Sequence, residues 1–180
     1  YEGDGVDGRS VSGFKFSPDL IWIKGRETGS NTIQHVLQDT VRGTNSLLTS
    51  NANYKEADLG THWGYISSFN SDGFTLTPGA GGPDHNNYNN LPYVAWCWKA
   101  GGAASSNTYG TIISSVSANN TYGFSVVSFT DGGSACTVGH GLSIAPKMII
   151  AKFRGAAGNW SVYHEAIGND HRLKLNLVDV

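Results

Sequence analysis

Hydrophobic residues along this chain come in short runs that alternate with polar residues, a pattern typical of β-strands. Most runs are bounded by Gly, Pro, Asn, Asp or Ser, the residues that favour turns. The number and spacing of the runs predict an all-β fold, an antiparallel β-sandwich or jelly roll. The expected strands are residues 20–24, 33–37, 63–69, 74–76, 93–98, 111–117, 124–129, 148–153, 160–163 and 173–177.

The clearest hairpin lies between residues 63–69 and 74–76, where Asp72-Gly73 provides the positive φ angle that a tight turn needs. One short helical turn is expected, either at residues 36–42 or at residues 52–58. Neither segment is long enough to form a helical layer.

The chain contains an internal repeat. Residues 17–26 align with residues 145–154 at an offset of 128. The offset pairs Lys24 with Lys152, and it predicts that the two segments are strands in equivalent positions of two related units. The chain would then start and end inside repeats, as an excerpt of a longer protein. Incomplete sandwiches leave strand edges unpaired, so contacts with other copies are expected.

Three parts follow from the repeat. Residues 1–99 are expected to form a β-sandwich unit that lacks its N-terminal strand. Residues 100–110, rich in Ala, Gly and Ser, are expected to be a flexible linker. Residues 111–180 would begin a second, similar unit that is cut short.

Composition narrows the class of function. Only 14% of residues are charged, and 12 Lys and Arg face 14 Asp and Glu. This balance argues against a nucleic-acid groove, which needs clustered basic residues. The sequence also lacks an apolar run of about 18 residues, so no membrane span is expected.

Catalytic chemistry has weak support. Glu56 and Asp58 have the alternating spacing of a carboxylate pair, but they fall in an expected loop or helical turn rather than in a strand. The Gly-x-Ser-x-Gly motif of many serine hydrolases is missing, although a Ser-His-Asp triad assembled in space stays open. No catalytic residue is assigned.

Metal and cofactor sites are not expected either. Cys97 and Cys136 are too few for a disulfide framework, and Cys97 is expected to be a buried free thiol in a strand. Asp4 and Asp7 resemble a calcium loop only faintly, because the closing Glu is missing.

The longest stretch without apolar periodicity is residues 79–90. Loops of this length are usually functional or disordered, and its amides and single Tyr suit the hydroxyls of neutral glycans or a neighbouring subunit. We expect the loop to lie on the surface, so that deleting residues 83–90 leaves folding nearly intact. The candidate binding residues are Asp84, His85, Asn86, Asn87 and Tyr88, with Trp63.

Two tryptophans form a second candidate binding surface. Trp96 and Trp98 point to one face of their strand and Cys97 points to the other. Together they are either part of a core or a platform for stacking.

In combination, several motifs resemble a repeated domain of uncharacterised proteins from marine and cyanobacterial phages. They are residues 18–24, 39–43, 68–74 and 93–100, with residues 139–142, 145–150 and 163–164 similar to the following copy. The resemblance implies a sandwich like that of concanavalin-type lectins and a virion structural or tail-fibre-like protein. It implies no established catalytic residues.

The expected function is therefore a module on the surface of a virion, which assembles with copies of itself and with other virion proteins and contacts host-surface glycans. An enzyme is the rival class, a glycan depolymerase on the same sandwich. A non-viral surface or filament protein built from the same repeats is equally compatible with the residues.

Overall fold

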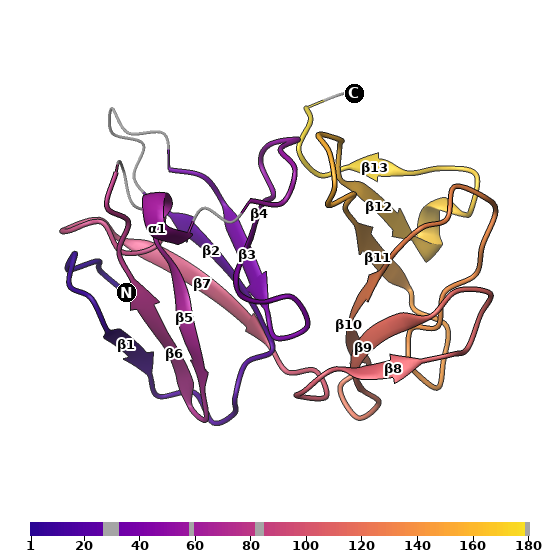
Figure 1. The fold of residues 1–180 in the computed structure, drawn as a ribbon, viewed down its shortest axis with the longest axis horizontal. Coiled ribbons are helices and arrows are strands. Elements are labelled where there is room, and N and C mark those ends of the chain that lie inside the picture. Colours follow the sequence, from indigo (N-terminus) through magenta and orange to yellow (C-terminus); the bar gives the residue numbers. More distant parts are fainter. Residues whose placement is uncertain (27–32, 58–59, 82–84, 179–180) are drawn as a thin grey trace.

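The computed structural model describes residues 1–26, 33–57, 60–81 and 85–178. The chain forms two lobes that lie side by side, with the N-terminus in the first and the C-terminus in the second (Figure 1). Strands dominate both lobes, which confirms the all-β prediction. The helical elements in the described residues are two short turns, α1 (Gly60–Trp63) and η1 (Glu165–Ile167).

The first lobe contains seven of the strands. They are β1 (Arg9–Ser12), β2 (Leu20–Gly25), β3 (Val36–Asp39), β4 (Gly43–Thr49), β5 (Tyr65–Asn70), β6 (Gly73–Thr77) and β7 (Tyr93–Trp98). The second lobe contains β8 (Ser105–Asn107), β9 (Ser114–Asn119), β10 (Phe124–Phe129), β11 (Met148–Ala151), β12 (Ser161–His164) and β13 (Leu173–Lys174).

The first lobe is a sandwich of two antiparallel sheets, one in the order β1-β6-β5 and the other in the order β4-β3-β2-β7. The expected hairpin is confirmed, since Asn70 pairs with Gly73 across the β5–β6 turn. The sheets close over a shared apolar core, whose burial is the main stabilising term. Its fully buried members are Ile21, Ile23, Val36, Leu47, Ile66, Phe74, Leu76 and Tyr93.

A buried amide ties the two sheets together. Gln38 on β3 is almost inaccessible to solvent, and its Oε1 accepts a hydrogen bond of 2.7 Å from the backbone N–H of Ile66 on β5. Its Nε2 donates to the carbonyl oxygen of Thr44. Both ends of the amide are thus satisfied, as a buried polar group requires. The expected helical turn at residues 36–42 is wrong, because Val36 to Asp39 are extended and paired on both sides.

Three strands have no counterpart in the predicted set. β1 and β8 are mostly polar, and β4 carries its two leucines side by side instead of alternating. Their pairing partners hold them in place rather than an apolar pattern of their own. A helical turn does occur, as α1, but after the second expected segment, whose described residues 52–57 are not helical.

The second lobe contains two three-stranded sheets, in the orders β10-β9-β8 and β11-β12-β13. The pairing of β11 with β12 follows that of β2 with β3. Ile21 lies opposite Gln38, and Ile149 lies opposite Tyr163. This is the equivalence that the internal repeat predicts for the two pairs of strands.

Residues 100–110, expected to be a flexible linker, are built into the fold. Ala100 is fully buried, and its N–H donates a hydrogen bond of 2.8 Å to the carboxylate of Asp19. The N–H of Gly101 donates to the hydroxyl of Ser117 at 2.9 Å. The strand β8 then pairs with β9. The connection between the lobes is therefore held by side chains from both.

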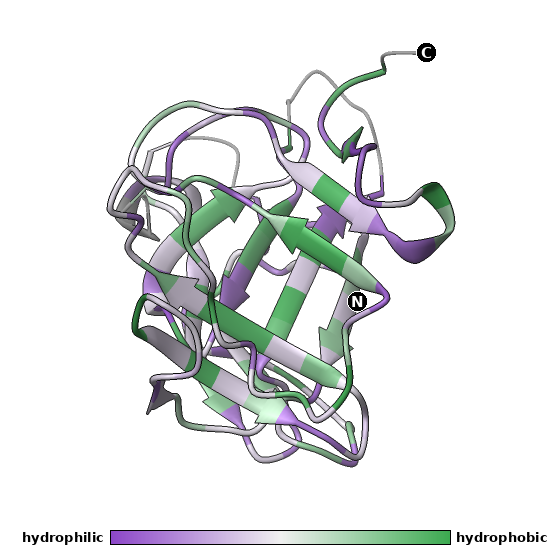
Figure 2. Cartoon of the chain, turned by 90° about the vertical axis from the view of Figure 1, so that its right-hand side faces the viewer, coloured by the Kyte–Doolittle hydropathy of each residue, from purple (hydrophilic) through white to green (hydrophobic). Residues whose placement is uncertain are grey.

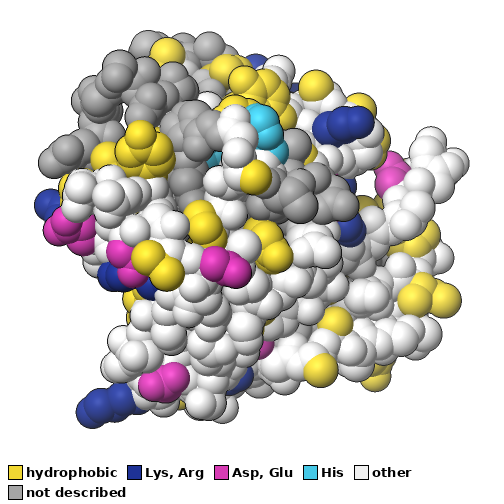
Figure 3. Space-filling model, turned by 60° about the vertical axis from the view of Figure 1, so that its left-hand side comes forward, with side chains coloured by type: hydrophobic (Ala, Val, Ile, Leu, Met, Phe, Trp, Pro, Cys, Tyr) yellow, Lys and Arg dark blue, Asp and Glu magenta, His cyan; other side chains and the backbone are white. Residues whose placement is uncertain are grey.

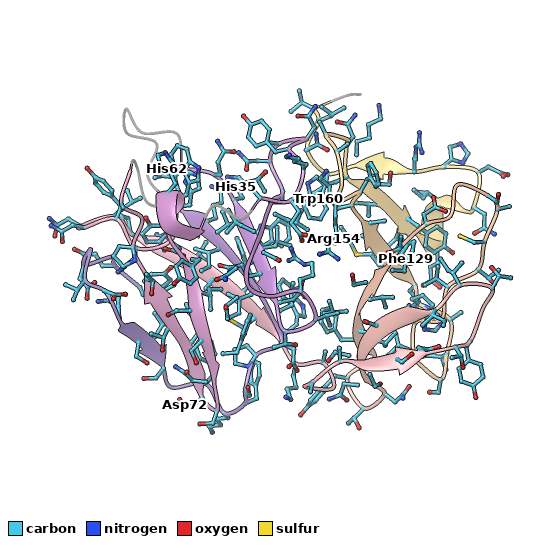
Figure 4. The ribbon with its side chains drawn as sticks, in the orientation of Figure 1. His35, His62, Asp72, Phe129, Arg154 and Trp160 are labelled. Atoms are coloured by element: carbon cyan, nitrogen blue, oxygen red, sulfur yellow. The ribbon has the colours of Figure 1, made fainter. Side chains whose placement is uncertain are left out.

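Trp160 anchors the second lobe on the first. It packs with Leu37 and Leu48 in a small apolar cluster, supported by Leu175 from the second lobe. Figure 4 shows Trp160 and Arg154 on the side of the second lobe that faces the first. The face of the β4-β3-β2-β7 sheet that points away from the sandwich core thus receives the second lobe.

Candidate functional site

The segment after residue 84, predicted as an exposed binding loop, is buried at residues 85–87 and exposed at residues 88–90. His85, Asn86 and Asn87 are 4%, 0% and 0% exposed, so the expectation that they lie on the surface is wrong. Tyr88 is 42% exposed, as expected for it. Asp84 lies outside the described residues.

His85 packs against Trp63, another of the candidate binding residues. The two rings stack with centroids 4.9 Å apart and planes inclined by 6°. The backbone N–H of Gln34 donates a hydrogen bond of 3.3 Å to Nδ1 of His85. Burial, with a smaller contribution from the charge of His62, lowers the pKa of His85 to about 4. His85 is therefore a neutral acceptor near pH 7 and does not act there as a cation.

Asn87 fastens the N-terminal residues to this segment. Its Nδ2 donates 3.1 Å hydrogen bonds to the carboxylate of Asp4 and to the carbonyl oxygen of Val6, while its Oδ1 accepts from the N–H of Asp4 at 3.2 Å. Tyr1 adds a hydrogen bond of 2.6 Å from its hydroxyl to the carbonyl oxygen of Asn86. The side-chain amide of Asn87, one of those that suggested glycan binding, thus binds the chain's own N-terminal residues.

A glycine makes this close approach possible. The N–H of Gly3 donates to the carbonyl oxygen of Leu91 at 2.8 Å, and its own carbonyl oxygen accepts from the N–H of Asn90 at 2.9 Å. A Cβ at residue 3 would collide with the carbonyl oxygen of Tyr88. The side chains of residues 85–87 are consequently structural, and Tyr88 is the accessible remainder of the predicted site.

Glu56, the carboxylate of the rival enzyme hypothesis, joins the two lobes. Its carboxylate accepts hydrogen bonds from Nη1 of Arg42 at 2.9 Å and from Nη2 of Arg154 at 2.6 Å. Desolvation raises the pKa of Glu56, but the hydrogen bonds and charges of the two arginines outweigh it and lower the pKa below its usual value. A carboxylate whose pKa is lowered and that is paired with two arginines is unsuited to act as a general acid near pH 7. Asp58 lies outside the described residues.

Ligands for a metal are not grouped within the described ranges, where no three His, Cys, Asp or Glu side chains come together. Asp4, from the weak calcium motif, accepts from the N–H of Val6 at 2.9 Å and pairs with Arg9. Cys97 is partly buried against the first-lobe core, and burial raises the pKa of its thiol to about 11. No helix in the described part of the chain is long and apolar enough to cross a membrane.

Charged side chains are dispersed on the side of the first lobe seen in Figure 3. Lys and Arg alternate with Asp and Glu over that surface and do not gather into a patch of one sign. This face of the lobe offers mixed, local charge to a partner.

A hollow of about 260 Å³ opens on the outer face of the β4-β3-β2-β7 sheet. Its walls are almost entirely apolar. Trp22 on β2 lies directly opposite Trp96 on β7, with ring centroids 5.8 Å apart, and Trp98 lies 6.5 Å from Trp22. The residues that line the hollow are Trp22, Lys24, His35, Trp96 and Trp98.

Trp96 and Trp98 divide between the two roles that the sequence left open for them. Trp98 stacks on Phe124 of the second lobe at 6.1 Å and so takes part in packing. Trp96 is 45% exposed. The accessible ring of Trp96 beside the partly covered rings of Trp22 and Trp98 has the form of a stacking platform.

The chain matches, over residues 1–180, the family described as Domain of unknown function (DUF7483). It belongs to that family. No curated protein and no solved structure matches it.

A second accessible feature of this DUF7483 chain lies on the far side of the second lobe. Side chains alternate along a strand, and Val162 and Trp160 are buried toward the first lobe, so Tyr163 and its neighbour Ile149 point away from it. Figure 2 looks onto this side of the second lobe, where β10 and β11, from different sheets, both carry hydrophobic residues. Phe129, Ile149, Tyr163 and Val127 are named the open face.

The open face corresponds to the buried core of the first lobe. The offset of 128 pairs Ile149 with Ile21 and Phe129 with Tyr1. Ile21 is fully buried beneath the β1-β6-β5 sheet, whereas Ile149 and Phe129 are each 47% exposed. Sequence reasoning assigned no binding role to these residues, although the repeat itself was the signal that could have identified them.

Proposed function

We propose that the chain is a structural module that assembles with a second copy of itself through the open face of its second lobe. The observation that carries the proposal is the contrast between Ile21 and its repeat equivalent Ile149, fully buried and 47% exposed respectively. Leaving large apolar side chains in water costs roughly 25 cal/mol for each Å² that could be covered.

The chemistry of the open face suits a second open face. It presents the rings of Phe129 and Tyr163 and the branched side chain of Ile149, without a charged group among them. Two such faces related by a twofold axis are complementary to each other, which is the commonest arrangement in homo-oligomers. The paired lobes would then form a face-to-face sandwich with sheets about 10 Å apart.

The resemblance to phage proteins supports a location for this assembly. We place the module on the surface of a virion, in a tail-fibre-like structure, in contact with copies of itself and with other virion proteins. A surface or filament protein of cellular origin would use the same face in the same way. The depolymerase alternative is less well supported, because both arginines hold Glu56 as a structural anion.

Cross-linking tests the proposal directly. A cysteine in place of Ile149, in a Cys136→Ser background that removes the exposed native thiol, lies close to its counterpart across the proposed twofold axis. Mild oxidation is expected to give a covalent dimer of the Ile149→Cys variant. The matched control is Tyr122→Cys in the same background, since Tyr122 is 69% exposed at the turn between β9 and β10. Equal yields of dimer from the two variants would contradict the proposal.

A further inference from the structure

We infer that the tryptophan hollow binds a sugar ring that carries a carboxylate, with Trp96 as the stacking surface and Lys24 as the partner of the acid group. This site is separate from the open face, which lies on the other side of the second lobe. The inference therefore does not depend on the self-association proposed above.

The register of β2 and β7 builds the site. Trp22 pairs with Trp96, and Lys24 pairs with Val94 two residues further along. Residues two apart on a strand share a face, so Lys24 stands next to both indoles on the outer face of the sheet. His35 precedes β3, the other neighbour of β2, and completes the wall on that side.

The aromatic walls of the hollow suit the C–H face of a sugar ring. An aromatic face attracts the positively polarised C–H groups of a pyranose through the negative charge of its π-system. Trp96, the exposed ring among the residues that line the hollow, can accept such stacking.

Lys24 determines the charge of the ligand. It forms no ion pair within the described part of the chain, although it lines an almost wholly apolar hollow. Its neighbour His35 is not a competing cation, because burial and the charge of Lys24 both lower the pKa of that imidazole. One cation without a partner in an apolar recess favours one anionic group on the ligand.

The volume limits the size of the ligand. About 260 Å³ corresponds to the space of about nine liquid water molecules at roughly 30 Å³ each. That is room for one ring, at the small end of ligand sites. A single ring with one carboxylate, such as a uronic acid residue, satisfies both the volume and the charge.

Titration of the intact chain with glucuronate and with glucose, followed by tryptophan fluorescence, tests the site. Glucuronate is expected to change the fluorescence saturably at millimolar concentration, and glucose to bind at least fivefold more weakly. Lys24→Gln is expected to weaken glucuronate at least fivefold and to leave glucose unchanged, while Trp96→Ala removes both responses. Tyr122→Ala, which replaces an exposed aromatic residue elsewhere, serves as the control.

Several outcomes would overturn the inference. They are a linear fluorescence response to glucuronate, equal binding of the two sugars, or glucuronate binding that Lys24→Gln leaves intact. Lys24→Gln keeps the tryptophans and changes only a partly exposed end group, so it tests the site even where Trp96→Ala fails to fold. Loss of sugar binding with dimerisation retained would refute only this site.

Discussion

The indole Nε1 of Trp160 donates a hydrogen bond of 2.8 Å to the carbonyl oxygen of Thr49, across 111 residues of sequence. Trp160 belongs to the second lobe and Thr49 ends the strand β4 of the first. The ring itself fills the apolar cluster around Leu37 and Leu48. One side chain thus supplies both packing and a buried polar contact between the lobes.

Replacing Trp160 should separate these two contributions. Trp160→Ala leaves a large cavity at the interface and is expected to lower the free energy of unfolding by about 3–5 kcal/mol. Trp160→Phe keeps an aromatic ring but leaves the carbonyl oxygen of Thr49 without its hydrogen-bond donor. A smaller loss in the free energy of unfolding, about 1–3 kcal/mol, is therefore expected. Urea denaturation measures both. An alanine variant as stable as the parent would show that the lobes do not depend on this contact.

Glu56 should make stability depend on pH in the acidic range. Its pKa is lowered in the folded chain, so the unfolded chain binds the proton more readily. The stabilisation is therefore complete above the ordinary carboxyl pKa of about 4.5 and is lost as the pH falls through the lower folded value. Glu56→Gln is expected to make the free energy of unfolding less dependent on pH between about pH 5 and pH 3, the range in which glutamate titrates.

The control for Glu56 is Glu165→Gln. Glu165 also forms an ion pair, with Lys147 at 2.9 Å, but both side chains are exposed. Exposed pairs contribute about 0–1 kcal/mol, so this variant should follow the parent curve closely. If the two variants behave alike, the contact of Glu56 with Arg42 and Arg154 does not stabilise the fold.

His85 should destabilise the first lobe when it is protonated. The pKa of His85 lies at about 4 in the folded chain, below the ordinary value of 6.5. Stability from the neutral ring is present above pH 6.5 and declines as the pH falls toward 4, because only the unfolded chain takes up the proton there. A His85→Gln variant, measured by thermal unfolding at pH 7 and pH 5, should lose less stability between the two than the parent. A steeper loss in the variant would contradict the assignment.

Asn87 should stabilise the fold, contrary to the prediction of a dispensable loop. Asn87→Ala removes the hydrogen bonds to Asp4 and Val6 and leaves buried polar groups unpaired, which costs about 1–3 kcal/mol. The neighbouring Asn89 is exposed, and Asn89→Ala should change stability by less than about 0.5 kcal/mol. Chemical denaturation of both variants gives the comparison.

The sequence predicted the strands that carry their own apolar pattern. The runs at residues 20–24, 93–98 and 124–129 appear as β2, β7 and β10, and the Asp72-Gly73 turn joins β5 to β6. Alternation and turn chemistry are local properties, so they can be seen in a single sequence. The polar strand β1 could not be found in that way, since its place comes from pairing with β6.

The candidate sites were harder to predict because they depend on contacts between residues that are far apart in the sequence. Asn87 looks like a loop amide until its partner Asp4, 83 residues away, is brought beside it by the fold. The tryptophan hollow depends on the register between β2 and β7, which alternation does not specify. The repeat did align Ile149 with Ile21, but only the structure shows that Ile21 is buried and Ile149 is exposed.

The molar mass of the chain in solution tests the central claim most directly. Sedimentation equilibrium over a range of concentrations is expected to show a dimer of 38.2 kDa, twice the 19.1 kDa of one chain. Ile149→Lys places a charge in the open face and should shift the equilibrium to the monomer, whereas Tyr122→Lys should leave the dimer intact. A parent chain that stays at 19.1 kDa at every concentration would contradict the account.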